Sequence, residues 1–95
     1  MTDTVDDITI SYTEDGIETV KQLDKKILSK GAWVTIIFQY QEWNNAKQVY
    51  GPAKYSIRRY QKRNGQYWQK SKFNISSDAQ AQQLIETLTG WLKIT

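Results

Sequence analysis

The residues best suited to chemistry in this chain lie between Lys54 and Lys72, in the sequence KYSIRRYQKRNGQYWQKSK. Seven of these 19 residues are basic and none is acidic. Four aromatic residues lie between the charges: Tyr55, Tyr60, Tyr67 and Trp68. Cationic side chains follow the phosphates of a nucleic acid strand, and aromatic rings stack on its unpaired bases. The segment therefore predicts a surface for single-stranded nucleic acid, against the alternative of a solvated hairpin whose aromatic residues fill a core.

The formal net charge of +3 conceals an uneven distribution along the chain. Residues 1–18 hold six acidic residues and no basic one, whereas residues 19–95 hold 13 basic residues against four acidic ones, a net charge of +9. A basic body of this kind attracts polyanions and speeds their association. We expect residues 1–16 to form a flexible acidic leader and residues 17–95 to form one nucleic-acid-binding domain. Within the leader, Ile8, Ile10 and Tyr12 alternate as in a short edge strand.

The residue types that are missing argue against several function classes. The chain has no histidine and no cysteine, which are common general bases, nucleophiles and metal ligands. The acidic residues after position 18 show no paired spacing, and no glycine-rich phosphate loop is present. We expect no catalysis, cofactor, metal or small-molecule substrate. No apolar run approaches the roughly 18–20 residues that cross a bilayer, so we expect no membrane association and a cytoplasmic, nucleoid-associated protein if bacterial, or a nuclear one otherwise.

The apolar pattern predicts four strands followed by one helix. Residues 17–28 are ambiguous between strand and helix, and we favour a strand. Residues 33–43 are rich in β-branched and aromatic residues, with alternating apolar positions. Residues 53–62 and 66–75 form a hairpin around Asn64-Gly65. Residues 44–52 are a connecting loop.

The two faces of this hairpin depend on the length of its turn. A two-residue turn places Ile57 beside Lys72, whereas a three-residue loop with Gly65 as a bulge places Tyr60 beside Trp68. A shift of one residue in the pairing moves every side chain of the strand to the opposite face of the sheet. The three-residue loop separates apolar from basic side chains more cleanly between the two faces, so we favour it. The binding surface is then predicted to comprise Lys54, Arg58, Tyr60, Lys62, Trp68, Lys70 and Lys72 on one face, together with Arg63 in the loop.

The predicted helix begins with a capping box made by Ser77 and Gln80, and Asp78 suits its N-terminus. Its apolar residues recur at helical spacing. The stripe comprises Ala81, Leu84, Ile85, Leu88 and Leu92, with Trp91 alongside. We interpret it as a core or dimer contact.

The hairpin and helix together resemble the transcriptional coactivator family called positive cofactor four, in particular its compact bacterial members. The motifs are KYSIRRY at residues 54–60, the Asn-Gly turn, and KSKFNISSDAQAQQLIETL at residues 70–88. Pro52 precedes a Tyr-x-Ile-Arg sequence, as in the bacterial proteins. The resemblance covers roughly residues 31–92, and its motifs are short.

The resemblance implies a curved four-stranded antiparallel sheet followed by one C-terminal amphipathic helix, and a homodimer that binds single-stranded DNA. It also implies that Arg58, Lys70 and Lys72 bind phosphates and that Tyr60 is the aromatic residue beside them. Gln61 stands where the family has a stacking tryptophan, so Trp68, Trp43 or Tyr50 would have to supply that ring.

The residues and the resemblance together favour a non-enzymatic single-stranded DNA-binding protein with weak sequence preference; the homodimer and a role in transcription regulation or in replication and repair are what the resemblance implies. Two alternatives remain open. The same surface suits single-stranded RNA, because stacking rings and phosphate contacts do not select the sugar. A protein-interaction module with a basic docking face is the other alternative.

Overall fold

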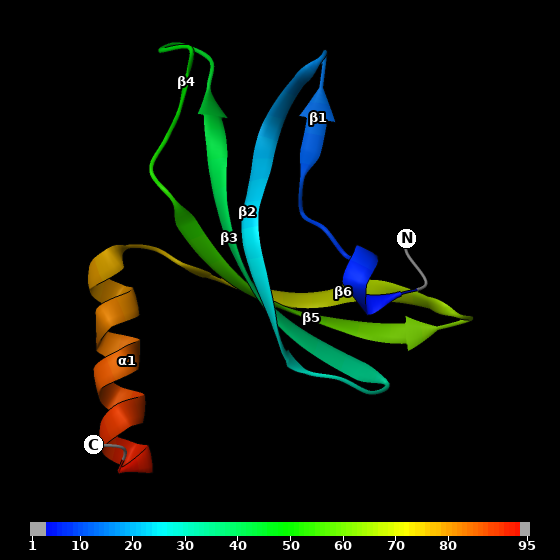
Figure 1. The fold of residues 1–95 in the computed structure, drawn as a ribbon, viewed down its shortest axis with the longest axis vertical. Coiled ribbons are helices and arrows are strands. Elements are labelled where there is room, and N and C mark those ends of the chain that lie inside the picture. Colours follow the sequence, from blue (N-terminus) through cyan, green and yellow to red (C-terminus); the bar gives the residue numbers. More distant parts are fainter. Residues whose placement is uncertain (1–3, 94–95) are drawn as a thin grey trace.

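Apolar residues at every second position from Val34 to Tyr40 place one face of a central strand in the core. The computed structural model describes residues 4–93, and in it strand β3 (Trp33–Asn44) buries Val34, Ile36, Phe38 and Tyr40 on one face. We call the face that carries these side chains the inner face, and the opposite one the outer face. Around β3 the chain forms a curled antiparallel sheet, from which the C-terminal helix projects (Figure 1).

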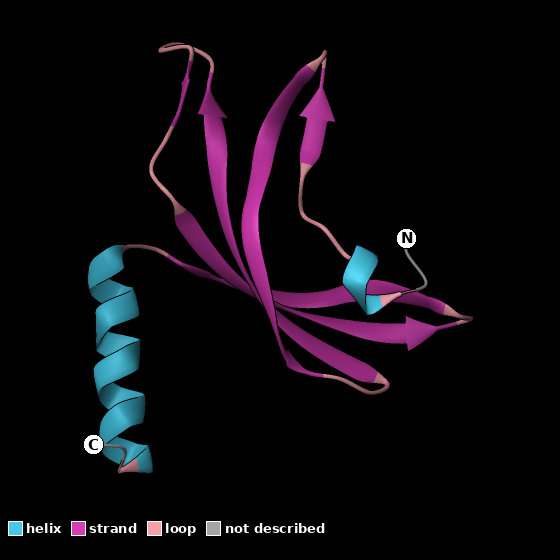
Figure 2. Cartoon of the chain, in the orientation of Figure 1, coloured by secondary structure: helices cyan, strands magenta, loops and turns pink. Residues whose placement is uncertain are grey.

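The strands follow one another in the order β1-β2-β3-β5-β6, and β4 pairs with an end of β3 (Figure 2). The other elements are η1 (Val5–Asp7), β1 (Tyr12–Glu14), β2 (Ile17–Ser29), β4 (Val49–Tyr50), β5 (Lys54–Arg63), β6 (Gln66–Ile75) and α1 (Asp78–Leu92). The predicted antiparallel sheet with one C-terminal helix is confirmed. The predicted number of four strands is wrong, because β1 and β4 add short edge pairings of three and two residues. Segments of this length are too short to show a period in the sequence.

The register predicted for the β5–β6 hairpin is wrong. Asn64 and Gly65 both have positive φ, at 52° and 77°, as a two-residue type I′ turn requires. Gln61 therefore pairs with Trp68, while Tyr60 pairs with Gln69. A β-bulge then leaves Lys70 without a partner in the ladder and brings Ile57 opposite Phe73. The bulge removes the Ile57–Lys72 pairing that had argued against the two-residue turn.

The N-terminal residues complete the core of the sheet. Ile8 and Ile10 are buried on the inner face, where they form one cluster with β3, Tyr60 and Tyr67. Sequence analysis did not predict this contribution from the acidic leader, of which residues 1–3 lie outside the described residues. Of the residues expected to form a short edge strand, only Tyr12 belongs to one, β1, which pairs with β2; Ile8 and Ile10 lie outside any strand.

Helix α1 begins where the sequence predicts. The Ser77 side chain accepts a hydrogen bond from the backbone N–H of Gln80, at 3.1 Å. The Gln80 side chain accepts from the backbone N–H of Ser76 rather than closing the capping box on Ser77. No residue described in the helix is buried within the chain, and its last residues, Trp91 and Leu92, are 78% and 64% exposed.

Candidate nucleic-acid interface

The expected binding surface is divided between the two faces of the sheet. Because of the two-residue turn, Lys54, Arg58, Tyr60 and Lys62 lie on the inner face of β5, whereas Trp68 lies on the outer face of β6 beside Gln61. Tyr60 is only 5% exposed, so its ring offers no open face on which a base can stack, although its edge lines a recess described below. Burial raises the pKa of Tyr60 above its ordinary value, although the nearby Arg58 charge opposes this shift.

An N-terminal strap, residues 5–10, covers part of the inner face. The Lys25 ammonium donates hydrogen bonds to the backbone carbonyls of Val5, Asp6 and Ile8, at 3.1, 2.8 and 2.7 Å. The Gln22 side-chain oxygen accepts from the backbone N–H of Ile10 at 3.1 Å. Two polar side chains of β2 thus fix a segment whose apolar residues belong to the core.

Arg58 is half-buried beneath this strap and is held by neutral partners. Its Nε donates to the Ser56 hydroxyl at 3.2 Å, and its guanidinium also donates to the Gln69 side-chain oxygen at 3.1 Å. The Ser56 hydroxyl in turn donates to the Asn74 side-chain oxygen at 2.7 Å. This chain of hydrogen bonds orients the guanidinium without neutralising its charge.

A recess, here called the inner recess, lies between the strap and the hairpin. Asp7, Ile8 and Thr9 line one side of it, and Arg58, Tyr60, Tyr67 and Gln69 line the other. Its volume is about 240 Å³. It is the part of the inner face at which Arg58 meets the surface.

The outer face presents a row of three side chains from three adjacent strands. Trp33 pairs with Gln61 across β3 and β5, and Gln61 pairs with Trp68 across β5 and β6. The two tryptophans are 40% and 43% exposed. Since neighbouring strands lie about 4.8 Å apart, the backbones at the two tryptophans are about 10 Å apart. Two ring systems at this spacing offer separate stacking surfaces on one face.

Cations surround this tryptophan row. The Arg59 guanidinium lies over the Trp33 ring, 4.5 Å from its centroid. Arg63 and Lys70 line a second recess together with Asn64, Trp68 and Gln69, which we call the hairpin recess. Lys70 is the extra residue of the bulge on edge strand β6, where a side chain can reach a ligand that lies across the sheet edge.

The remaining predicted cations have other surroundings. Lys54 forms a salt bridge with Glu42, and this hydrogen bond raises the pKa of the lysine. The Lys62 ammonium lies over the Tyr67 ring at 5.5 Å. Lys72 pairs with Arg58 across the β5–β6 ladder. The charge of Lys54 is therefore balanced by that of Glu42, while Lys62 and Lys72 lie on the inner face of the hairpin.

The alternative stacking residues suggested by the sequence lie at a different end of the sheet. Trp43 and Tyr50 pack edge to face, with their ring centroids 5.0 Å apart, and Lys21 lies over Tyr50. The Tyr50 hydroxyl donates to the carbonyl of Glu18 at 2.8 Å. These contacts hold β4 against the sheet, and the tryptophan row is a separate surface.

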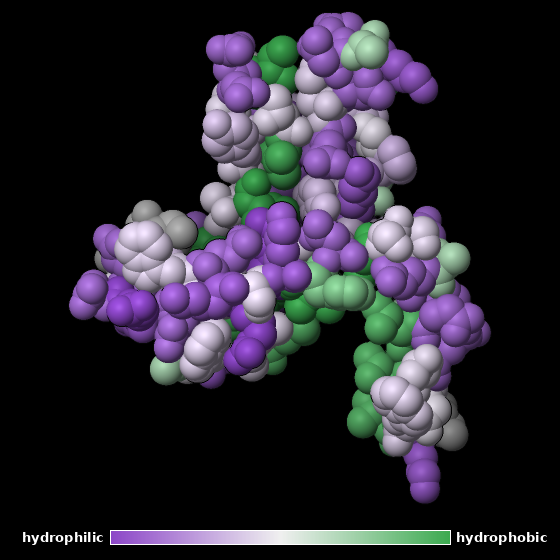
Figure 3. Space-filling view, turned by 180° about the vertical axis from the view of Figure 1, so that it is seen from behind, coloured by the Kyte–Doolittle hydropathy of each residue, from purple (hydrophilic) through white to green (hydrophobic). Residues whose placement is uncertain are grey.

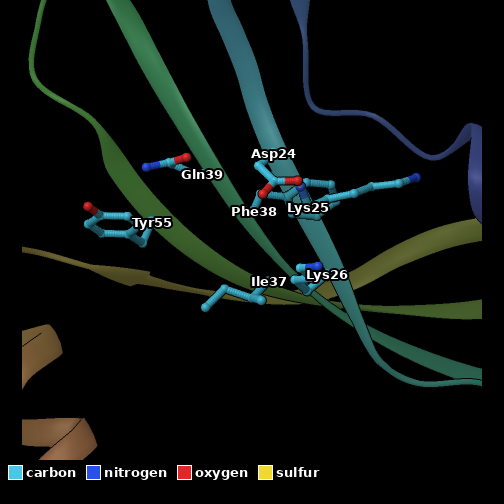
Figure 4. Close-up of a pocket in the computed structure, with 7 residues that line it drawn as sticks. All are labelled: Asp24, Lys25, Lys26, Ile37, Phe38, Gln39 and Tyr55. Atoms are coloured by element: carbon cyan, nitrogen blue, oxygen red, sulfur yellow. The ribbon is translucent and has the colours of Figure 1, made fainter.

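A third hollow occupies the middle of the outer face and part of β2. Figure 4 shows Tyr55, Gln39 and Asp24 around it, with Lys25 extending away toward the N-terminal segment. Its lining is mainly apolar, and its charged residues are of both signs, Asp24 and Lys26 among them. A carboxylate here disfavours phosphate, so we place the candidate interface at the hairpin end instead.

Comparisons with protein-family models, curated proteins and solved structures found no match. Among the described residues, no group of three or more acidic side chains is placed to hold a metal ion. No helix within residues 4–93 has the length and apolar character needed to span a membrane.

Sequence reasoning missed two residues of this interface, Trp33 and Arg59. Both were visible as residue types in the sequence, but their contact depends on the β3–β5 register, in which Trp33 pairs with Gln61 and Thr35 with Arg59. The Asn64-Gly65 signal was sufficient to find the two-residue turn, and hence to place Trp68 beside Gln61.

Proposed function

We propose that this protein is a non-enzymatic single-stranded DNA-binding protein whose binding surface is the outer face at the end of the β5–β6 hairpin. The observation that carries the proposal is the pair of half-exposed tryptophans, Trp33 and Trp68, with Arg59, Arg63 and Lys70 beside them. No acidic residue occurs between Glu42 and Asp78, so the strands that carry most of this surface repel no phosphate.

Stacking and phosphate contacts supply the affinity in this proposal. Each stacked base contributes about 1–3 kcal/mol. Contacts from Arg59, Arg63 and Lys70 neutralise about three phosphates, which gives a slope of log K against log salt of about −2 for a single strand. These contacts read no base edge, so sequence preference on the outer face is weak.

We further propose that two copies associate through helix α1. Its exposed apolar residues are Ile85, Leu88, Trp91 and Leu92. Figure 3 shows hydrophobic surface along the side of the helix that is turned toward the sheet. A small domain commonly covers such a surface by oligomerisation. The resemblance to positive cofactor four supports the same arrangement, and it alone suggests a role in transcription regulation or in replication and repair.

The deciding experiment measures fluorescence anisotropy of labelled oligomers of about 20 nucleotides at two salt concentrations. It compares single-stranded DNA, duplex DNA and single-stranded RNA, with tryptophan quenching followed in parallel. We expect salt-dependent, single-strand-selective binding with quenching. Tighter binding to RNA would make RNA the ligand, and equal weak binding to all three without quenching would favour a protein-interaction module.

A matched pair of lysine variants tests the location of the surface. Lys70→Ala removes an exposed cation beside Trp68, whereas Lys47→Ala removes another exposed cation, in the β3–β4 loop. We expect only Lys70→Ala to weaken binding and to flatten the salt slope. Equal effects of the two variants would contradict the assignment to the hairpin.

A further inference from the structure

The inner recess contains two opposite charges that are not paired with each other. Asp7 lines the strap side and Arg58 lines the hairpin side, and no salt bridge joins them in the described part of the chain. Arg58 donates to the neutral side chains of Ser56 and Gln69 and also lies within hydrogen-bonding reach of the Tyr60 hydroxyl, and these partners use only part of a guanidinium with five N–H donors. Asp7 accepts a hydrogen bond from the Thr4 hydroxyl, and its carboxylate retains further acceptor positions.

The walls of the recess suit a flat, uncharged group. Tyr60, Tyr67 and Ile8 supply apolar surface, so the recess is not a cluster of cations built for phosphate alone. The Asp7 carboxylate would repel a phosphate there. A ligand that accepts hydrogen bonds on one edge and donates them on the other fits both charged groups.

The inner recess adjoins the proposed binding surface at the edge of the sheet. Gln69 lines both the inner recess and the hairpin recess, in which Trp68 and Lys70 lie. Trp68 faces outward and Gln69 inward on the same edge strand, and the bulged Lys70 follows them. A strand stacked on Trp68 can therefore turn over the edge of β6, pass Lys70 with a phosphate, and present its next base to the inner recess.

We propose that the inner recess binds one unpaired guanine base of that strand. Arg58 donates two hydrogen bonds to guanine O6 and N7, the commonest specific contact of arginine with a base. Asp7 accepts from guanine N1–H and N2–H₂, which are free only when the base is unpaired. Adenine presents a donor in place of O6, and thymine lacks N7 and the amino group, so neither satisfies both side chains. The inference rests on the proposed single-strand binding and adds a base preference at one position.

The test uses the full chain and four labelled oligomers. One is oligothymidine, and the others carry a single central guanine, 7-deazaguanine or hypoxanthine. We expect guanine to bind roughly tenfold more tightly than oligothymidine, as one bidentate base contact provides. Loss of N7 in 7-deazaguanine and loss of the amino group in hypoxanthine should each remove most of this gain.

Two variants assign the gain to the recess. Asp7→Asn should abolish the preference for guanine without weakening the affinity for oligothymidine, and Asp6→Asn, which changes the neighbouring carboxylate outside the recess lining, should retain the preference. Arg58→Lys keeps the charge but loses the bidentate geometry, so it should also lose the preference. Thermal unfolding shows whether each variant is folded, and the modified bases test the wild-type protein even if a variant is not.

The outcomes separate this inference from the proposed function. Equal affinity for the guanine and thymine oligomers overturns the recess assignment and leaves single-strand binding in place. A guanine preference that survives in Asp7→Asn overturns it as well. Failure of every oligomer to bind overturns both.

Discussion

Replacing Ile8 with alanine tests whether the N-terminal strap is part of the folded core. Ile8 is 4% exposed and belongs to the same buried cluster as Tyr60 and Tyr67. The substitution removes three carbon atoms, worth roughly 0.8 kcal/mol each, or about 2.4 kcal/mol in transfer free energy. The cavity left behind adds to this loss, so we expect the free energy of unfolding to fall by about 3 kcal/mol.

The measurement is urea-induced unfolding followed by tryptophan fluorescence. Val49→Ala is the matched control, because Val49 is an exposed aliphatic residue on the short strand β4. The control should change the free energy of unfolding by less than about 0.5 kcal/mol. In a thermal scan, the Ile8→Ala loss corresponds to a decrease in Tm of roughly 12–24 °C for a domain of this size.

A change of less than about 0.5 kcal/mol for Ile8→Ala would refute the reasoning and return the strap to the flexible leader expected from its acidic composition. If the strap is part of the core, nucleic acid can reach the inner face that it covers only when the strap is released. Releasing the strap exposes both Ile8 and Ile10, at a cost of about 3–6 kcal/mol. Competition between strap and nucleic acid for the inner face would then weaken binding by a factor of about 10² to 10⁴, since each 1.4 kcal/mol is tenfold.

Four further predictions address the surface, the core and the assembly. Trp68→Ala should weaken binding of a single-stranded oligomer by about 1–3 kcal/mol, measured by anisotropy, and unchanged affinity would exclude stacking on this ring. Arg63→Gln should reduce the salt slope by about 0.7, and a slope equal to that of the wild type would remove Arg63 from the phosphate contacts. Burial raises the pKa of Tyr60, so ionisation above pH 10 favours the unfolded chain, and stability is lost as pH rises from the ordinary tyrosine pKa of 10.0 toward the higher folded value. Tyr60→Phe should lose less stability over that range in urea titrations, and parallel losses would contradict this cause. Leu88→Lys should convert a dimer to a monomer in sedimentation equilibrium, and a wild-type protein that is monomeric at micromolar concentration would refute the helix-mediated dimer.

Local patterns in the sequence were sufficient for the main elements. The alternation through Phe38 identified β3 and its buried face, Asn64-Gly65 identified the β5–β6 hairpin, and Ser77 marked the start of α1. In each case the signal lies within a few residues of the structure that it specifies.

The features that were not predicted depend on contacts between distant segments. The two-residue turn puts Tyr60 and Trp68 on opposite faces, and the bulge at Lys70, which no glycine marks in the sequence, shifts the register again beyond them. Ile8 lies among acidic residues, and its burial depends on β3, β5 and β6. For this reason the strap could not be assigned to the core from its own composition.

The position of the strap in the chain has a consequence for synthesis. Ile8 and Ile10 leave the ribosome before their partners Tyr60 and Tyr67, which follow 50 to 59 residues later. At about 5–20 residues per second, the interval is roughly 3–12 s, far longer than the time in which a hairpin forms. Until the last hairpin emerges, the nascent chain can cover these two isoleucines only with the β3 members of the cluster. The acidic residues around the two isoleucines keep the undocked strap charged. We expect docking of the strap on the inner face to be the final step of folding.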